Sequence, residues 1–200
     1  MQYTIKKHIM KKIALFLMMA AAVMGATAQN EHMTFKGIPI DGSVTSFAAK
    51  LQQKGFTSQG QQNGNAFLMG MFAGYKDCTI GVVGDESGTT VKVAVIFPEY
   101  DKWSQLYGCF SSLKDMLTQK YGTPSQESET FDAYSQPDDD MMRMIYVGTD
   151  KCKYYAVFET QRGSIELMIS HADYSEGFVL LSYYDKLNQQ KAMNSAIDDL

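Results

Sequence analysis

Three short apolar runs separated by turns most constrain how this chain can fold. They occupy residues 67–74, 78–83 and 91–97. Apolar side chains alternate along the third run, at Val91, Val93, Val95 and Phe97. A period of two is expected of a half-buried strand. The connection 84–88 is short, polar and bounded by glycines, which favours a β-hairpin over a crossover. The runs therefore predict neighbouring antiparallel strands.

A likeness of this stretch returns 74 residues later. The matched positions are Gly74 with Gly148, Cys78 with Cys152, Val83 with Val157, Tyr100 with Tyr174, and Val91, Val93 and Val95 with Ile165, Leu167 and Ile169. A helical pattern upstream of each block repeats at an offset of 66, so the second copy carries extra residues, most simply within 123–140. The repeated order of helix and strands predicts one unit made twice.

Two amphipathic helices are predicted, one ahead of each block of strands. The first begins after the capping residue Ser43 and ends at Gly55. The second runs from about residue 101 to 121 and ends before Gly122. Residues 31–42 are expected to form an edge strand or an extended lead-in. Further strands are predicted at 130–134, 141–147, 153–158, 165–169 and 178–184, and a terminal helix at 186–200.

These elements predict an α+β fold built from two tandem units, each a helix plus an antiparallel sheet, with the helices packed on one face of the sheet. The first unit spans residues 29–100. The second spans 101–200 and carries an acidic insertion and a C-terminal tail. About 172 residues follow the first 28, which is enough for a substantial core as one domain or two closely packed halves.

Residues 1–28 have the pattern of a cleaved signal peptide. Four lysines precede the apolar run 13–24, and Ala26-Thr27-Ala28 supplies the small residues that a signal peptidase requires. Cleavage is expected after Ala28, and either Met1 or Met10 could be the start. The apolar run is too short for stable membrane insertion. No cysteine stands at the cleavage point, so we expect a periplasmic or extracellular protein without a lipid anchor.

The charge of the chain becomes more negative once residues 1–28 are removed. The segment takes away four basic residues and no acidic ones, leaving 14 basic and 22 acidic residues, a net charge of −8. All of the excess lies after residue 98, where nine basic residues face seventeen acidic ones. Nucleic acid and anionic membrane surfaces are poor partners for such a chain.

The sequence offers little that resembles an active site. Beyond the signal peptide only His32 and His171 remain, and neither stands in a nucleophile or zinc-ligand motif. Asp138, Asp139 and Asp140 lack the alternate spacing of a calcium loop, so a solvated acidic loop is expected. No phosphate-binding glycine loop is present either. We therefore predict a protein that is not an enzyme and needs no cofactor or metal.

The three cysteines leave two interpretations open. Cys78 and Cys152 occupy matching places in the two copies, which makes them a candidate disulfide across a pseudo-symmetry axis. Alternatively, both residues and Cys109 are small buried hydrophobes, since cysteine is among the most buried residue types. A catalytic thiol is not supported by any local motif.

Aromatic residues supply the candidate binding surface. The chain has twelve tyrosines, and the adjacent pairs Tyr154-Tyr155 and Tyr183-Tyr184 lie in predicted strands. Because neighbouring strand residues point to opposite faces, one member of each pair is expected to leave the core. The candidate binding residues are Tyr155, Met168, Tyr183 and Tyr184. Tyrosine and methionine suit protein or glycan recognition. The alternative is that loops or the terminal helix cover this face.

Three short motifs carry a resemblance. They are the opening Phe35–Gly42, the helix exit Lys54-Gly55-Phe56, and Lys120–Pro124. Together they resemble uncharacterised secreted proteins of Bacteroidota over most of the chain after residue 28. The duplicated helix-plus-sheet plan is similar to the tandem fold of β-lactamase inhibitor proteins. Both likenesses concern structure, and neither implies a catalytic residue or transfers a function.

The sequence as a whole predicts an exported, non-enzymatic binding or interaction module whose partner is a protein or a glycan. Two other classes stay open. One is an enzyme that uses dispersed carboxylates, for example on a saccharide, because paired carboxylates need only geometry. The other is a structural component of the envelope. No local pattern identifies the ligand, the oligomeric state or the exposed face of the sheet.

Overall fold

The computed structural model describes residues 31–198. The predicted signal peptide and its cleavage point lie outside the described residues. From His32 onward the described chain forms one compact unit. The α+β prediction is confirmed: four helices and a large antiparallel sheet make up most of the described chain.

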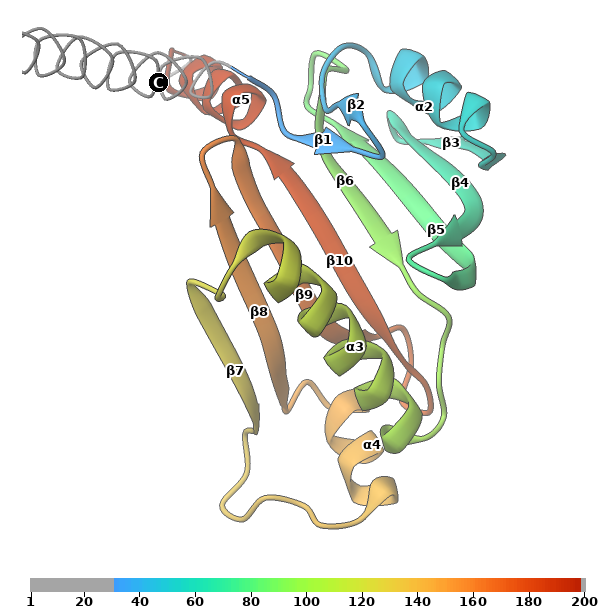
Figure 1. Cartoon of the computed structure of the whole chain (residues 1–200), viewed down its shortest axis with the longest axis vertical. Helices are drawn as coiled ribbons and strands as arrows, with labels where there is room; N and C mark the ends of the chain where they lie inside the picture. Colours follow the sequence, from blue (N-terminus) through green and yellow to red (C-terminus); the bar gives the residue numbers. More distant parts are fainter. Residues whose placement is uncertain (1–30, 199–200) are drawn as a thin grey trace, which may run out of the picture. The chain divides into compact units, whose positions relative to one another are not determined.

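Eight strands form this sheet, in the order β3-β4-β5-β6-β10-β9-β8-β7 (Figure 1). Their bounds are β3 Thr57–Gln62, β4 Asn65–Phe72, β5 Tyr75–Gly84, β6 Thr90–Ile96, β7 Gln126–Phe131, β8 Cys152–Thr160, β9 Gly163–His171 and β10 Gly177–Asp185. All neighbouring strands are antiparallel. A separate small hairpin, β1 (Thr34–Phe35) with β2 (Ile38–Pro39), replaces the expected lead-in strand.

The helices are α2 (Val44–Gln53), α3 (Trp103–Tyr121), α4 (Asp140–Gly148) and α5 (Lys186–Asp198). The predicted boundaries of the first two are confirmed. The Ser43 hydroxyl accepts a hydrogen bond from the Ser46 N–H (3.2 Å) and caps α2. Gly122, with φ of 88°, ends α3, a backbone angle that glycine adopts without strain.

Helix α4 corrects one prediction, because residues 141–147 are helical where a strand was expected. The Asp139 carboxylate accepts a hydrogen bond from the Met142 N–H (2.8 Å) and caps the helix. Met144 and Val147, three residues apart, are its buried side chains. Asp138 and Asp139 lie in an exposed loop, as predicted, but this loop leads directly into α4, whose first residue is Asp140. Asp140 also accepts a hydrogen bond from the Ser104 N–H (3.3 Å).

Three of the four helices, α2, α3 and α4, pack on the same face of the sheet, together with the β1–β2 hairpin. A side chain added at Gly84 of β5 would meet Val44 of α2, and one added at Gly177 of β10 would meet Leu106 of α3 and Val147 of α4. Strand alternation and register place both glycines on one face of the sheet. Phe35 of β1 stacks on Phe72 (5.2 Å between centroids) on that face. The main core lies between this face and these elements.

The strand order is mirrored about the central β6–β10 pair. Helix α2 precedes the meander β3 to β6, helix α3 precedes β7 to β10, and the two last strands pair (Figure 1). Counting from each helix, β5 corresponds to β9 and β6 to β10. The offset of 74 residues instead matched β5 with β8 and β6 with β9. That offset therefore aligned strands of similar composition that hold different places in the sheet.

Candidate functional site

The face of the sheet opposite α2, α3 and α4 is the main candidate site, here called the helix-free face. Strand register places one continuous row across it: Tyr155 opposite Met168, Met168 opposite Leu180, Leu180 opposite Ile96, Ile96 opposite Thr79, and Thr79 opposite Met69. Side chains opposite each other on neighbouring strands lie on one face and contact one another. The row therefore spans the sheet from β8 to β4.

Two further rows extend this face along the strands. One contains Val157, Glu166, Ser182, Ala94, Gly81 and Phe67, and the other contains Glu159, Ser164, Tyr184, Lys92 and Val83. Most of these side chains are half-buried, while Met168 and Met69 are each 38% exposed. The alternate residues on the covered face, such as Leu167 and Leu181, are 0–1% exposed. The contrast identifies a mainly apolar and more exposed face, opposite the one on which α2, α3 and α4 pack.

Three of the four predicted binding residues lie on the helix-free face. Tyr155 and Met168 are direct cross-strand neighbours. Tyr184 lies in the adjoining row, with the Lys92 ammonium 4.7 Å from the centre of its ring. The prediction is wrong for Tyr183, which is 6% exposed on the covered face. Burial raises the pKa of Tyr183, as expected for a phenol removed from water.

A buried polar joint, which the sequence analysis missed, connects α5 to the start of the described chain. The Asp185 carboxylate is fully buried. It accepts hydrogen bonds from the Met33 N–H (2.6 Å) and the Asn188 N–H (2.9 Å), and lies 3.0 Å from His32 Nδ1. Asn188, also fully buried, donates from Nδ2 to the carbonyls of Ile40 and Thr90 (3.1 Å each). Every one of these contacts is internal, so the joint positions elements.

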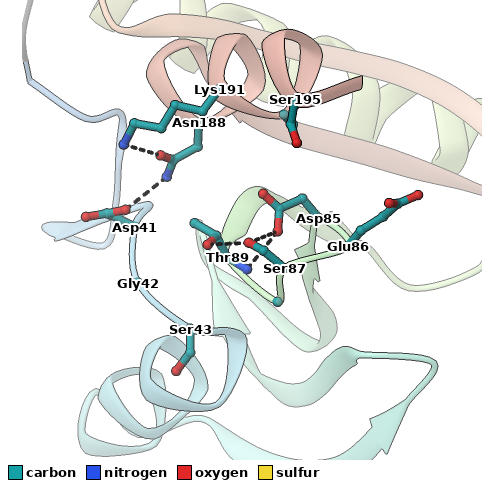
Figure 2. A pocket seen from close by; sticks show the side chains of 12 residues that line it. Asp41, Gly42, Ser43, Asp85, Glu86, Ser87, Thr89, Asn188, Lys191 and Ser195 are labelled. Atoms are coloured by element: carbon teal, nitrogen blue, oxygen red, sulfur yellow. Dashed lines mark hydrogen bonds between the residues drawn. The ribbon is translucent and has the colours of Figure 1, made fainter. Parts of the chain in front are cut away.

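A polar pocket of about 760 Å³ opens beside this joint, as Figure 2 shows. It is lined by the segment from Asp41 to Ser43, the β5–β6 turn from Asp85 to Thr89, and one side of α5. Lys191 Nζ donates to Asn188 Oδ1 (3.2 Å), and Asn188 Nδ2 donates to Asp41 Oδ1 (3.1 Å). Asp41, Asn188 and Lys191 therefore already have partners within the protein.

The opposite wall of the pocket is the β5–β6 turn, which is held together by its own hydrogen bonds. Asp85 Oδ1 accepts hydrogen bonds from Ser87 Oγ (2.6 Å) and the Thr89 N–H (2.9 Å). Partial burial acts to raise the pKa of Asp85, but these hydrogen bonds outweigh it and lower the pKa below 3.8. Asp85 is therefore an ionised residue that fixes the turn, which leaves Glu86 as the uncommitted carboxylate on this wall.

His171 is the last residue of β9. Its Nε2 lies 3.0 Å from Asp150 Oδ1, and its Nδ1 lies 2.9 Å from the Asp173 carbonyl oxygen. Cys152 lines the same pocket of about 180 Å³. Burial raises the pKa of Cys152 to about 12, whereas a thiol nucleophile needs a lowered pKa. Both ring nitrogens of His171 already contact Asp150 or Asp173. Asp150, His171 and Cys152 are therefore not arranged for nucleophilic attack by the thiol.

The candidate disulfide between Cys78 and Cys152 is not formed. All three cysteines are free thiols. Cys78 lies in β5 and Cys152 in β8, and β6, β10 and β9 separate these strands. Four strand spacings amount to about 19 Å, while a disulfide requires Cα atoms within roughly 7 Å. The apparent symmetry of the two cysteines came from the offset that matched non-equivalent strands.

Within residues 31–198, no helix is long and apolar enough to cross a membrane, and no three His, Cys, Asp or Glu residues are grouped to hold a metal ion. Comparison of the chain with protein-family models, curated proteins and solved structures finds no match.

Proposed function

We propose that this protein is an exported, non-enzymatic binding module that contacts a protein partner through its helix-free face. The observation that carries the proposal is the row from Tyr155 to Met69, in which apolar side chains are continuous across β8, β9, β10, β6 and β4 with Thr79 between. Contiguous exposed apolar surface of this extent marks interaction sites in folded proteins.

The dimensions of the face suit a macromolecule. The three rows cover six strands, β8 to β4, which at about 4.8 Å spacing span roughly 24 Å. With about 20 Å along the strands, the area is roughly 500 Å², which is typical of a functional apolar patch and smaller than the ~800 Å² that each partner buries in a standard interface. The pocket that borders Tyr155 and Met168 is small, about 180 Å³. A broad and shallow surface of this kind suits another protein better than a small molecule.

The chemistry of the face favours a protein over a glycan. Its side chains are mainly Val, Leu, Ile, Phe, Met and Tyr, and methionine and aromatic residues are enriched at protein interfaces. A sugar needs several converging hydrogen-bond donors and acceptors. On the first two rows these are limited to Tyr155, Thr79, Glu166 and Ser182, and Ser182 is only 2% exposed.

The pocket of Figure 2 is the basis for the alternative, an enzyme that uses dispersed carboxylates. Asp41, Asp85 and Glu86 do line one pocket. Asp85, however, is held by its own turn, and Asp41 is bound to Asn188. A general acid and a general base need carboxylates free to exchange protons with a substrate. The arrangement therefore supports a structural joint better than a catalytic pair.

We also infer that the two halves arose by duplication of one helix and four strands. The mirrored strand order about β6 and β10 supports this, because each half contributes one helix followed by four strands, with α4 inserted between β7 and β8 in the second half. Export is proposed from the composition of residues 1–28. Amino-terminal sequencing of the secreted protein, expected to start at Gln29, tests it.

The test of the binding face uses two methionines of similar exposure. Residues 29–200 are used as bait for crosslinked capture from envelope and culture fractions, alongside Met168→Asp and the control Met116→Asp. Met168 is 38% exposed on the helix-free face, and Met116 is 46% exposed on α3. We expect one saturable partner whose capture falls at least tenfold with Met168→Asp and is unchanged with Met116→Asp.

Equal capture by both variants, with circular dichroism showing that both are folded, would refute the use of this face. Glycans enriched in place of a protein would redirect the proposal to saccharide recognition. Reproducible turnover in a glycosidase-substrate screen would favour the carboxylate enzyme instead.

A further inference from the structure

Glu166 is an unusual residue on the helix-free face, because its carboxylate lies beside the apolar side chains of Val157 and Met168. It lies in β9, with Val157 opposite it on β8 and Ser182 opposite it on β10. Met168, two residues along the same strand, lies next to it on the same face. Glu166 itself is half-buried. The neighbouring side chains therefore exclude part of the water around the Glu166 carboxylate and give it no hydrogen bond in return.

Within residues 31–198, Glu166 makes no ion pair and no side-chain hydrogen bond. The protein pairs carboxylates elsewhere: on β7, both Glu127 and Glu129 contact the Lys114 ammonium. Lys92 is the basic residue of the neighbouring row, but it lies two strands away and is stacked on Tyr184. The carboxylate of Glu166 thus faces outward without a cation from the part of the chain that the structure describes.

A partner that covers the helix-free face must remove the remaining water from Glu166. Burying an unpaired carboxylate is strongly unfavourable, so a purely apolar partner would be rejected. A partner with a cation at that position would gain a charge-assisted hydrogen bond in an apolar surround instead. Glu159, diagonally adjacent on the same face, adds a second negative charge. The excess of 22 acidic over 14 basic residues beyond residue 28 also attracts basic partners.

We propose that the partner is a protein surface on which an arginine or lysine side chain projects from an apolar patch and meets Glu166. Glu166 then acts as the specificity residue of the face, while Tyr155, Met168, Leu180 and Ile96 supply the apolar contact. This inference rests on the proposed function, since it takes the helix-free face as the binding surface and adds the chemistry of what it binds.

The probe for this inference is a phage-displayed library of random 16-residue peptides. Selection uses immobilised residues 29–200, with depletion on the Met168→Asp variant so that only binders of the helix-free face remain. Enriched peptides are synthesised, and their affinities are measured by fluorescence anisotropy for the wild type, Glu166→Gln and the control Glu86→Gln. Glu86 is an exposed carboxylate on the pocket of Figure 2, away from this face.

We expect the enriched peptides to carry arginine or lysine flanked by apolar residues. Their affinity should fall on the order of tenfold or more with Glu166→Gln, stay unchanged with Glu86→Gln, and weaken as salt is raised. Thermal unfolding of Glu166→Gln should match or exceed that of the wild type, which separates a binding role from a structural one.

The remaining outcomes separate the two proposals. Peptides that distinguish Met168→Asp from the wild type but lack a basic residue, or bind Glu166→Gln equally well, would overturn the role of Glu166 and leave the binding face standing. Peptides that bind the wild type and Met168→Asp alike, or no enrichment after depletion, would overturn both.

Discussion

Tyr183 and Tyr184 are consecutive residues of β10 that lie on opposite faces of the sheet. The Tyr183 ring packs edge-on against Phe35 of the β1–β2 hairpin, with 5.4 Å between centroids. The Tyr184 ring lies on the other face, beneath the ammonium of Lys92 at 4.7 Å. One residue therefore belongs to the core and the other to the proposed binding surface.

This division predicts unequal effects of truncating the two rings. Tyr183→Ala should lower the free energy of unfolding by about 3–4 kcal/mol, because it leaves a cavity in a packed core. Tyr184→Ala should cost less than about 1 kcal/mol, since its ring is already half in water. Urea denaturation followed by circular dichroism measures both. Equal losses for the two variants would mean that both faces of β10 are buried.

The same pair shows where sequence reasoning reached its limit. Alternation along a strand fixes which residues share a face, so one member of each pair, Tyr154-Tyr155 and Tyr183-Tyr184, could be expected to leave the core. Which of the two sets of alternate residues faces the helices depends on strand register and on residues far away in sequence, here Phe35. No local pattern contains that information, so Tyr183 was wrongly included.

Helices α2 and α3 could be predicted because their signals are local: Ser43 before the first, Gly55 and Gly122 at the ends, and apolar stripes between. Helix α4 could not be distinguished from a strand, because a seven-residue segment that is apolar except for Arg143 fits both periods. Asp139, which caps α4, was the available signal. The acidic run was instead interpreted as a loop.

The sequence contained a local pattern for one of the two parts of the polar joint, the helix cap. Asp185 and Asn188 have the three-residue spacing of a helix cap, and Asp185 accepts from the Asn188 N–H. The other part is the contact of Asp185 with Met33, 152 residues earlier in the chain. Pairing at that separation is decided by tertiary packing and leaves no local pattern.

Two glycines predict opposite effects of adding one methyl group. At Gly177, a Cβ would lie 2.7 Å from a Leu106 methyl and 3.0 Å from one of Val147, so α3 and α4 would have to move. Gly177→Ala should destabilise the protein by about 1–3 kcal/mol. At Gly108, inside α3, nothing lies within 4 Å, and Gly108→Ala should stabilise it by about 0.5–1 kcal/mol. Thermal unfolding distinguishes them. A Gly177→Ala variant as stable as the wild type would contradict the close contact of α3 and α4 with β10.

The free thiols predict slow reaction with Ellman's reagent in the folded state. Burial raises the pKa of Cys78 to about 11 and that of Cys152 to about 12, and it also raises the pKa of Cys109. At pH 8 the reactive thiolate is therefore scarce as well as buried. We expect three thiols to react promptly only after denaturation, with no change of melting temperature on adding reductant. A disulfide-linked Cys78–Cys152 peptide in a non-reducing digest would contradict this arrangement.

Asp85 is predicted to contribute to stability at neutral pH and to lose this contribution at acid pH. Its folded pKa is lowered below 3.8, against a partial burial that acts to raise it, by hydrogen bonds from Ser87 and Thr89. A carboxyl with a lowered folded pKa stabilises the protein above its unfolded pKa, and this stability is lost as pH falls through the folded pKa. Asp85→Asn should therefore cost at most about 1 kcal/mol at pH 7, because Asp85 is partly exposed.

That cost should shrink below about pH 4 and vanish at lower pH, where the wild-type carboxyl is also neutral. Urea denaturation of the wild type and Asp85→Asn at pH 7, 5, 4 and 3 measures the difference. Glu86→Gln is the control, as an exposed neighbour in the same turn without a hydrogen bond in the described chain. Its difference from the wild type should be small at every pH. If the cost of Asp85→Asn were constant from pH 7 to pH 3, the turn would depend on the shape of the side chain, and its charge would contribute nothing.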